Sequence, residues 1–297
     1  MVKKGIAGVE LTALINELQF LVHGKVSQIY HQDKKELLFQ LHARGKGKQL
    51  LKVIPGKLLC LTDRKDVPLA PSSFCMQLRK YLGNASINAL YQKEAERIVV
   101  FELEKAEKYY LIIELFSKGN IVLTDDTYMI IGTLERQVWK DRVVKNKEKY
   151  VFPEAKVNWK TIDEKELGTI LKKSGKKNLA TCLATELNLG GVYAEEVCRR
   201  VRVDKDVLPG EGDAVKIMKG IKEMVTLLEK PEGYFACDEV TPFRLTDVKV
   251  ERKVETYNEA INTLNPFQIV SPYEKRIGTL KGRIKQQEEA IEKLQDD

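Results

Sequence analysis

Basic side chains are concentrated in one stretch of the sequence. Residues 134–177 contain 13 Lys or Arg and 7 Asp or Glu, a balance of +6, whereas the whole chain carries +7. Lysine and arginine side chains on one surface attract phosphates, so this stretch predicts a surface that faces nucleic acid. A lysine-rich helix and linker that are merely solvated would show the same charge, and charge alone does not decide between the two. The candidate phosphate-binding lysines are Lys172, Lys173, Lys176 and Lys177.

Two adjacent glycines, Gly190 and Gly191, lie between two stretches of helical periodicity, in the segment Asn188-Leu189-Gly190-Gly191. Paired glycines at the start of a helix let backbone N–H groups approach an anion closely, as in helix-hairpin-helix modules that hold nucleic-acid phosphates. Glycine is also the commonest residue just past a helix end, so a plain helix stop is the alternative.

The remaining reactive residue types do not form a catalytic or metal-binding pattern. The 5 cysteines are widely spaced without a C-x-x-C pair, and the 3 histidines follow no metal-ligand spacing. The sequence lacks a phosphate loop, a dinucleotide fingerprint, a nucleophile elbow and a zinc-protease helix. We therefore predict a binding protein and not an enzyme, with no cofactor, no metal and buried, reduced cysteines.

The elements that must position these residues begin with a helix and a series of short strands. Apolar residues recur at helical spacing over residues 9–22 and stop before Gly24, and a second helix is predicted at 72–81. Runs of β-forming residues separated by turn signals predict about eight strands, at 26–31, 36–42, 49–54, 57–62, 98–103, 109–116, 120–124 and 128–134. This count predicts an α+β fold with an antiparallel sandwich or pseudo-barrel.

The second half of the chain is predicted to be helical. Helical patterns occupy residues 163–173, 177–187, 193–201 and 212–228. At the end, Ile277, Leu280, Ile284, Gln287, Ile291 and Leu294 follow the 3-4 spacing of a coiled-coil seam, which we expect to continue into a longer arm. The expected domains are a β-rich domain at 1–153, a helix-hairpin-helix domain at 154–234, a connecting segment at 235–270 and the start of a coiled coil at 271–297.

Length and hydropathy place further limits on the class of protein. A chain of 297 residues with 43% hydrophobic and 31% charged residues has enough apolar material for about two folded domains. Its uninterrupted apolar stretches are far shorter than the roughly 18 residues that span a bilayer, and the first residues lack the apolar region of a secretory signal. We expect a cytoplasmic protein with no membrane contact.

Several phrases of the sequence occur together and in order in one family. They are VEL at 9–11, NEL at 16–18, GKV at 24–26, QIY at 28–30, PSSF at 71–74, LRKYL at 78–82, ERIV at 96–99, EL at 114–115, KGNI at 118–121 and LGGVYAEEVC at 189–198. Over the whole chain, this series resembles the amino-terminal half of the NFACT family, the Rqc2/NEMF/RqcH proteins, also labelled fibronectin-binding protein A. The character of these phrases suggests an archaeal or eukaryotic-type member of the family.

The resemblance implies both a fold and a function. The implied fold is a domain similar to formamidopyrimidine-DNA glycosylases, then a helix-hairpin-helix domain, then the base of a coiled-coil arm. The implied function is ribosome-associated quality control, in which family members bind large ribosomal subunits, with their rRNA, that are obstructed by peptidyl-tRNA. They recruit charged tRNA, typically for alanine, for untemplated tailing of the stalled chain, while the subunit supplies the chemistry.

The resemblance also implies three tRNA-binding residues. Family members use an aspartate-arginine pair and an aspartate on the first helix, and the matching positions here are Glu96, Arg97 and Glu10. Both carboxylates are therefore one methylene longer than the family pattern, which puts the tailing activity in question. A carboxylate can accept from base amino groups, and arginine can stack on a base or bind phosphate. The alternative is an exposed ion pair of little consequence.

Other functions remain open at this stage. A scaffold that binds ribosomes or RNA without tailing, and that recruits a ubiquitin ligase or another factor through the coiled coil, would fit the same sequence. A fibronectin-binding adhesin fits less well, because no export signal or anchor is visible. A DNA-repair lyase would need an amino-terminal proline nucleophile, whereas the chain starts Met1-Val2-Lys3.

Overall fold

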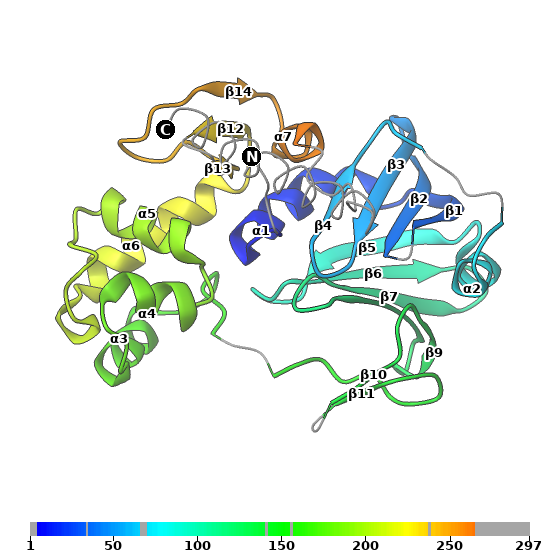
Figure 1. Cartoon of the computed structure of the whole chain (residues 1–297), viewed down its shortest axis with the longest axis horizontal. Coiled ribbons are helices and arrows are strands. Elements are labelled where there is room, and N and C mark those ends of the chain that lie inside the picture. The colour runs from blue at the N-terminus through cyan, green and yellow to red at the C-terminus, as the bar shows by residue number, and fades with distance from the viewer. Residues whose placement is uncertain are drawn as a thin grey trace, which may run out of the picture. The chain divides into compact units, whose positions relative to one another are not determined.

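The computed structural model describes residues 5–33, 35–65, 70–139, 142–154, 157–236 and 239–264. Nine antiparallel strands form one sheet in the order β4-β3-β2-β1-β5-β6-β7-β8-β9 (Figure 1). The strands are β1 (Lys25–Asp33), β2 (Glu36–Ala43), β3 (Gly47–Ile54), β4 (Leu58–Leu61), β5 (Ser86–Gln92), β6 (Ile98–Glu104), β7 (Lys108–Glu114), β8 (Asn120–Asp125) and β9 (Ile130–Thr133).

The sheet changes direction between β1 and β5. These two strands share a single residue pair, Lys25 with Ser86, whereas every other neighbouring pair of strands is matched over several residues. Side chains from both halves of the sheet, such as Phe39 of β2 and Phe101 of β6, line the same small apolar space. The predicted α+β class is confirmed, with a large antiparallel sheet as its main element.

Eight of the nine strands were predicted, and β5 was missed. The register between β5 and β6 shifts between Ile87 and Ala89. This bulge interrupts the alternation of buried and exposed residues that identifies a strand in a sequence. The strand therefore has no clear period of two, although Ile87 and Leu90 are buried.

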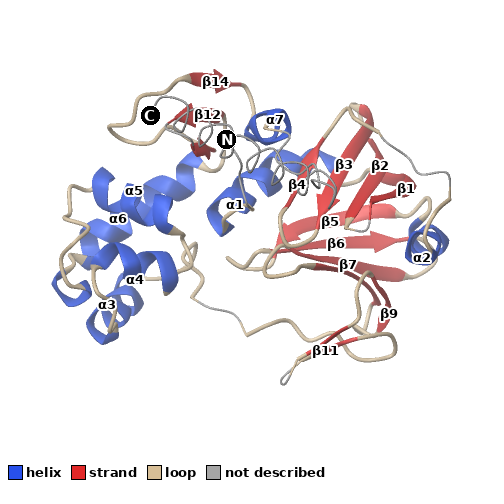
Figure 2. Cartoon of the chain, viewed as in Figure 1, coloured by secondary structure: helices blue, strands red, loops and turns tan. Residues whose placement is uncertain are grey.

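The helices begin where the sequence provides a cap. In five of the described helices, the side chain before the first turn accepts a hydrogen bond from the backbone N–H three residues later; these caps are Ser72, Asp163, Asn178, Asp213 and Thr256. The helices are α1 (Gly8–Glu17), α2 (Ser73–Leu82), α3 (Glu164–Lys173), α4 (Leu179–Thr185), α5 (Gly191–Arg200), α6 (Ala214–Leu227) and α7 (Tyr257–Thr263). Figure 2 shows the strand-rich first part and the helices that follow it.

The first helix is shorter than the predicted 9–22 because its last turn is a 3-10 helix, Leu18–Leu21. Helix α1 packs against β5 and α7, and its buried face includes Val9, Leu11 and Leu14. It therefore connects the large sheet to the last described helix.

The segment expected to be a connector contains regular structure. Strands β12 (Gly233–Ala236), β13 (Glu239–Thr241) and β14 (Arg252–Val254) form a small sheet, which α7 follows. A further two-stranded ladder, β10 (Gln137–Val138) with β11 (Val143–Val144), lies beyond β9. The predicted coiled coil at 271–297 lies outside the described residues.

The structure bears on the predictions made for the cysteines and for membrane-spanning helices. Cys60, Cys75, Cys182 and Cys198 are buried, as predicted, and Cys237 lies outside the described residues. Burial raises the pKa of the Cys60 thiol to about 12. Within the described ranges, no helix has the length and apolar character needed to cross a membrane.

Candidate nucleic-acid interface

The side chain of Gln92, at the end of β5, connects three parts of the chain. Its Nε2 donates to the backbone carbonyls of Gly8 (3.1 Å) and Glu96 (2.9 Å). Its Oε1 accepts from Thr12 Oγ1 (2.6 Å) and Lys160 Nζ (2.8 Å). Gln92 is 8% exposed, so each of these bonds satisfies a polar group that water does not reach freely. We call the side chains of Thr12, Gln92 and Lys160, with the backbone carbonyls of Gly8 and Glu96, the polar junction.

The predicted pair Glu96 and Arg97 lies in the loop between β5 and β6, beside the polar junction. The backbone carbonyl of Arg97 accepts from Leu115 N at 2.8 Å, which fixes the loop against the end of β7. Both side chains are partly buried. Burial lowers the pKa of Arg97, and the negative charge of Glu96 opposes that shift.

The Arg97 guanidinium is a cation that is held without a strong partner. Among the described residues, it forms no hydrogen bond and no ion pair within 4.0 Å. Partial burial removes some of its water, and the missing partner leaves its donors available. An arginine in this state is suited to bind a phosphate or the edge of a base.

The predicted glycine hinge meets Glu96 in space. Asn188 Nδ2 lies 3.5 Å from Glu96 Oε2, although 92 residues separate the two. Gly190 caps α5 with a φ of +80°, a conformation that favours glycine, and a Cβ on Gly190 would lie 3.8 Å from Ala7 Cβ. Gly191 is exposed, and a Cβ there would meet nothing within 4 Å. The start of α5 is therefore open beside the pair.

Glu10 is not exposed at this interface. It is 4% exposed, and its carboxylate accepts from Ala7 N (Oε2, 2.8 Å) and from the Tyr193 hydroxyl (Oε1, 2.8 Å). Burial and the charge of Glu10 raise the pKa of the Tyr193 and Tyr257 hydroxyls. Glu10 thus fixes the start of α1 to α5, two residues from the Gly8 carbonyl that Gln92 binds.

The predicted lysine cluster lies elsewhere. Lys172 and Lys173 end α3, Lys176 and Lys177 follow in the loop to α4, and all four are exposed. Among the described residues, no hydrogen bond or ion pair joins them to Glu96, Arg97 or Gly190. The structure therefore brings the glycine hinge and the pair together but does not bring the lysines to them.

The sequence analysis missed Lys160. Burial lowers the pKa of Lys160 to about 8, and its Nζ lies 5.9 Å from the ring centre of Trp159. The one sequence feature that could have indicated this residue is the position of Lys160 directly after Trp159. Its bond to Gln92 adds a second partly buried cation to the interface.

No metal site is evident in the parts of the chain that the structure describes, since no group of three or more His, Cys, Asp or Glu could hold an ion there. The interface offers cations, an open helix start and amide groups. These groups bind anions and bases and provide no nucleophile paired with a base.

Solved structures share this architecture. The chain superposes on the fibrinogen-binding protein from Staphylococcus aureus with a TM-score of 0.74 and 17% identity, covering 88% of this chain and 99% of that one. It superposes on the N-terminal part of the fibronectin/fibrinogen-binding protein from Streptococcus suis with a TM-score of 0.71 and 18% identity, covering 88% and 98%. The large antiparallel sheet with its following helices is thus the fold of this class of protein.

The family follows from the sequence comparison. The chain belongs to the NFACT family, because the family model for "NFACT N-terminal and middle domains" matches residues 7–296. This confirms the predicted membership. The chain is 27% identical over 329 aligned positions to the archaeal Rqc2 homologue aRqcH from Methanocaldococcus jannaschii, covering 99% of this chain and 48% of that protein.

Eukaryotic relatives match over shorter stretches. The chain is 30% identical over 202 residues to the ribosome quality control complex subunit NEMF homologue from Drosophila melanogaster, covering 66% of this chain and 20% of that protein. It is 32% identical over 139 residues to ribosome quality control complex subunit 2 from Saccharomyces cerevisiae, covering 46% and 13%. The chain spans about half the length of the archaeal relative and a smaller share of the eukaryotic ones.

Proposed function

We propose that this chain is the RNA-binding part of a ribosome quality control factor. In this proposal it binds large ribosomal subunits, through rRNA, that are obstructed by peptidyl-tRNA in the cytoplasm. It recruits charged tRNA, of the alanine type, for untemplated tailing of the stalled chain. The subunit supplies peptidyl transfer, so the chain itself is not an enzyme and needs no cofactor.

The partly buried guanidinium of Arg97 carries the proposal, because among the described residues it forms no hydrogen bond or ion pair. The charge of the adjacent Glu96 acts on it, and the Glu96 carboxylate in turn lies 3.5 Å from the Asn188 amide, two residues before the Gly190 cap of α5. Such a set can contact both a phosphate and the polar edge of a base. The names of relatives from an archaeon, a fly and a yeast supply the biological setting.

The pair and the hinge are proposed to act on tRNA directly. Arg97 would bind a base or phosphate, Glu96 would accept from a base amino group, and Gly190 and Gly191 would bring the start of α5 to a phosphate. Helices α4 and α5 with the hinge between them would form the core of a helix-hairpin-helix domain at 154–234, next to the β-rich domain at 1–153. Lys172, Lys173, Lys176 and Lys177 would contact a separate stretch of RNA.

Glu10 is proposed to support tRNA binding indirectly, by positioning α5. Because both of its oxygens already accept hydrogen bonds in the interior, its contribution to tRNA binding would come from holding α5 and its hinge against α1. The Glu10 carboxylate reaches the Tyr193 hydroxyl from the first turn of α1.

Two alternatives remain. A scaffold without tailing activity would bind the ribosome or RNA without a tRNA role for the Glu96–Arg97 pair, and would recruit a ubiquitin ligase or another factor through the expected coiled coil at 271–297. Binding of fibronectin is the less favoured alternative, and the names of the two structural neighbours are what raise it.

The test measures two quantities for each variant: binding to purified large subunits that carry peptidyl-tRNA, and retention of added charged tRNA on them. Arg97→Ala and Glu96→Ala are compared with wild type and with Arg44→Ala, which removes an exposed arginine from the turn between β2 and β3. We expect Arg97→Ala to reduce tRNA retention at least about tenfold, in line with loss of one charged contact, and Arg44→Ala to have little effect.

The outcomes separate the alternatives. Loss of tRNA retention with unchanged subunit binding supports recruitment. Unchanged retention in both variants contradicts a role for the pair and favours the scaffold. Because cation–phosphate contacts release counterions, binding that is insensitive to salt would contradict RNA recognition altogether.

A further inference from the structure

An open cavity of about 570 Å³ lies on the side of the sheet that carries the β10–β11 ladder. Three aromatic side chains line it, Phe116 from the β7–β8 turn, Trp139 beside β10 and Phe152 from the segment after β11, together with Arg142 and Pro153. We call this the aromatic cavity. Its volume falls within the range of small-ligand pockets.

The aromatic cavity is bordered by apolar side chains that the described chain leaves uncovered. Trp139 is 42% exposed and Val151 is 59% exposed, and both line the cavity. An exposed tryptophan with an exposed valine in one cavity is typical of a binding surface, because monomeric proteins rarely leave such patches open.

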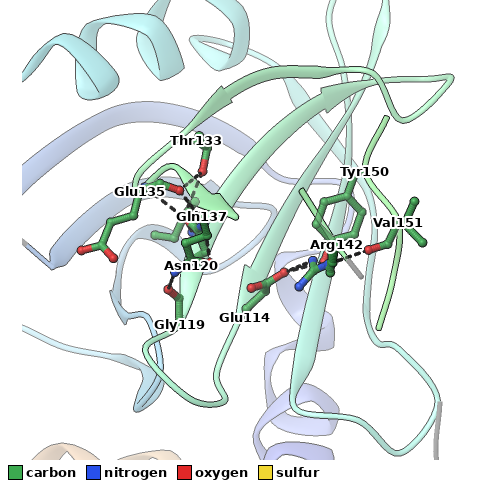
Figure 3. Close-up of polar contacts among 10 residues, drawn as sticks. Glu114, Gly119, Asn120, Thr133, Glu135, Gln137, Arg142, Tyr150 and Val151 are labelled. Atoms are coloured by element: carbon green, nitrogen blue, oxygen red, sulfur yellow. Dashed lines mark hydrogen bonds and ion pairs between the residues drawn. The ribbon is translucent and has the colours of Figure 1, made fainter. Parts of the chain in front are cut away.

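The floor of the aromatic cavity is rigid. The Arg142 guanidinium binds the Glu114 carboxylate, which is 1% exposed and also accepts from the Tyr150 hydroxyl at 2.8 Å (Figure 3). Arg142 Nε donates to the Val151 carbonyl at 2.8 Å. The guanidinium therefore keeps a fixed position, 5.5 Å from the ring centre of Trp139 and 4.9 Å from that of Tyr150. Its plane and the tryptophan ring offer flat faces without the entropy of a mobile side chain.

Lysines and carboxylates both lie near the aromatic cavity. Lys118, which follows Ser117 on the rim, is exposed. Lys93 Nζ lies 5.2 Å from the ring centre of Phe152 and pairs with Glu94 Oε1 at 3.4 Å. Glu154 lies on the wall, and Glu114 is paired with Arg142. Aromatic faces with lysines on the rim are the combination by which proteins hold single-stranded nucleic acid.

A backbone hydrogen bond links the wall of the aromatic cavity to the loop that carries Arg97. The Arg97 carbonyl is bonded to Leu115 N, and the next residue, Phe116, lines the cavity. One RNA strand that binds at the Arg97 loop can therefore continue to the aromatic cavity along the same end of β6 and β7.

We propose that the aromatic cavity binds an unpaired RNA base, which stacks on Trp139 while the exposed Lys118 attracts a neighbouring phosphate. This inference rests on the proposed function, since it requires that the chain binds RNA. It adds a second contact, one that recognises a single-stranded nucleotide and does not use the Glu96–Arg97 pair.

The position of Trp139 provides a direct test. The chain contains 2 tryptophans, and the other, Trp159, is 1% exposed. A base that stacks on Trp139 will quench tryptophan fluorescence, whereas Trp159 will contribute a constant background. The probe is a short oligoadenylate, titrated into wild-type protein, Trp139→Ala and Trp139→Phe at fixed ionic strength.

We expect saturable quenching with wild type. Trp139→Ala should weaken binding of the oligoadenylate about tenfold, measured by fluorescence anisotropy of a labelled probe, and Trp139→Phe should retain most of the affinity because a flat ring remains. Met76→Ala, which removes another exposed apolar side chain on α2, should have no effect.

Two results would overturn the inference. Equal affinity of wild type and Trp139→Ala for the oligoadenylate would exclude stacking. Quenching by an oligoproline peptide but not by the oligoadenylate would make the aromatic cavity a peptide site. If Trp139 is not needed while Arg97→Ala still loses tRNA on ribosomal subunits, this inference fails and the proposed function stands. If the oligoadenylate stacks on Trp139 but the protein does not bind ribosomal subunits, the cavity binds a base and the proposed function fails.

Discussion

The Tyr193 hydroxyl donates a 2.8 Å hydrogen bond to Oε1 of Glu10, although 183 residues separate the two in the sequence. The bond joins the first turn of α5 to the first turn of α1, in the interior. The other oxygen of Glu10 accepts from Ala7 N, so the carboxylate also caps its own helix. A buried carboxylate with these partners holds the glycine hinge of α5 at a fixed distance from the loop that carries Arg97.

Tyr193→Phe tests this relationship. Loss of a hydrogen bond to a buried charged group should lower the free energy of unfolding by about 1.5–3 kcal/mol, measured by guanidinium denaturation. The matched control is Tyr109→Phe, which removes a 2.9 Å bond from a buried tyrosine to the exposed carboxylate of Glu107 and should cost less, about 1 kcal/mol. Equal losses of unfolding free energy in the two variants would show that the Tyr193–Glu10 bond stabilises the fold no more than the Tyr109–Glu107 bond.

Gly119 makes a second contact that can be tested. It has a φ of +68°, and a Cβ there would lie 1.8 Å from Gly56 N, in the turn between β3 and β4. Gly119→Ala should therefore separate the two turns and lower the free energy of unfolding by about 3 kcal/mol or more. Gly45 has a similar φ of +76° with nothing within 4 Å, so Gly45→Ala should lose about 1 kcal/mol, from backbone strain alone. Similar losses would mean that the contact between the turns is weak.

Local pattern accounts for the parts of the fold that were predicted. Alternation, caps and glycine or proline turns identified most strands of the sheet and the helices α1 to α6, because each depends on neighbouring residues. The bulge at Ile87 concealed β5, and β12 to β14 are too short to show a period. The sequence placed Glu96, Arg97 and the glycine hinge on separate elements, and their contact depends on tertiary packing.

The functional environment of single residues was also beyond the reach of the sequence. Glu10 was predicted to contact tRNA, yet its side chain is buried because Tyr193 and the start of α1 surround it. Lys160 acquires its role from Gln92, which is 68 residues away. No periodicity relates such pairs, since they are brought together by the contact between the sheet and the helices.

The titration of the Glu17 carboxylate should make the free energy of unfolding depend on pH. Its carboxylate accepts from Tyr257 N (2.6 Å) and Asn258 N (2.8 Å) at the start of α7. Burial raises the pKa of Glu17 from 4.5 to about 7, and these two backbone bonds oppose the shift. Between pH 4.5 and 7 the folded state therefore binds more protons than the unfolded state, so the contribution of Glu17 to stability falls as the pH rises through this window.

The expected loss from this group is about 2–3 kcal/mol across the window, measured as the free energy of unfolding in denaturant series at several pH values. Glu17→Gln removes the titration and should make the curve flatter by that amount. A matched control is Glu229→Gln, because Glu229 is exposed and should leave the curve unchanged. A wild-type curve parallel to that of Glu17→Gln would contradict the assignment.

Lys160 links pH to RNA binding. Burial lowers its pKa from 10.5 to about 8, so its positive charge is mostly present near pH 7 and mostly lost near pH 9. If this charge attracts RNA at the polar junction, the affinity for tRNA should fall several-fold over that interval at constant salt, measured by filter binding. Lys160→Arg keeps its charge throughout and should bind equally at both pH values, whereas Lys160→Met should bind weakly at both. A fall of equal size in wild type and Lys160→Arg would assign the titration to another group and remove Lys160 from the interface.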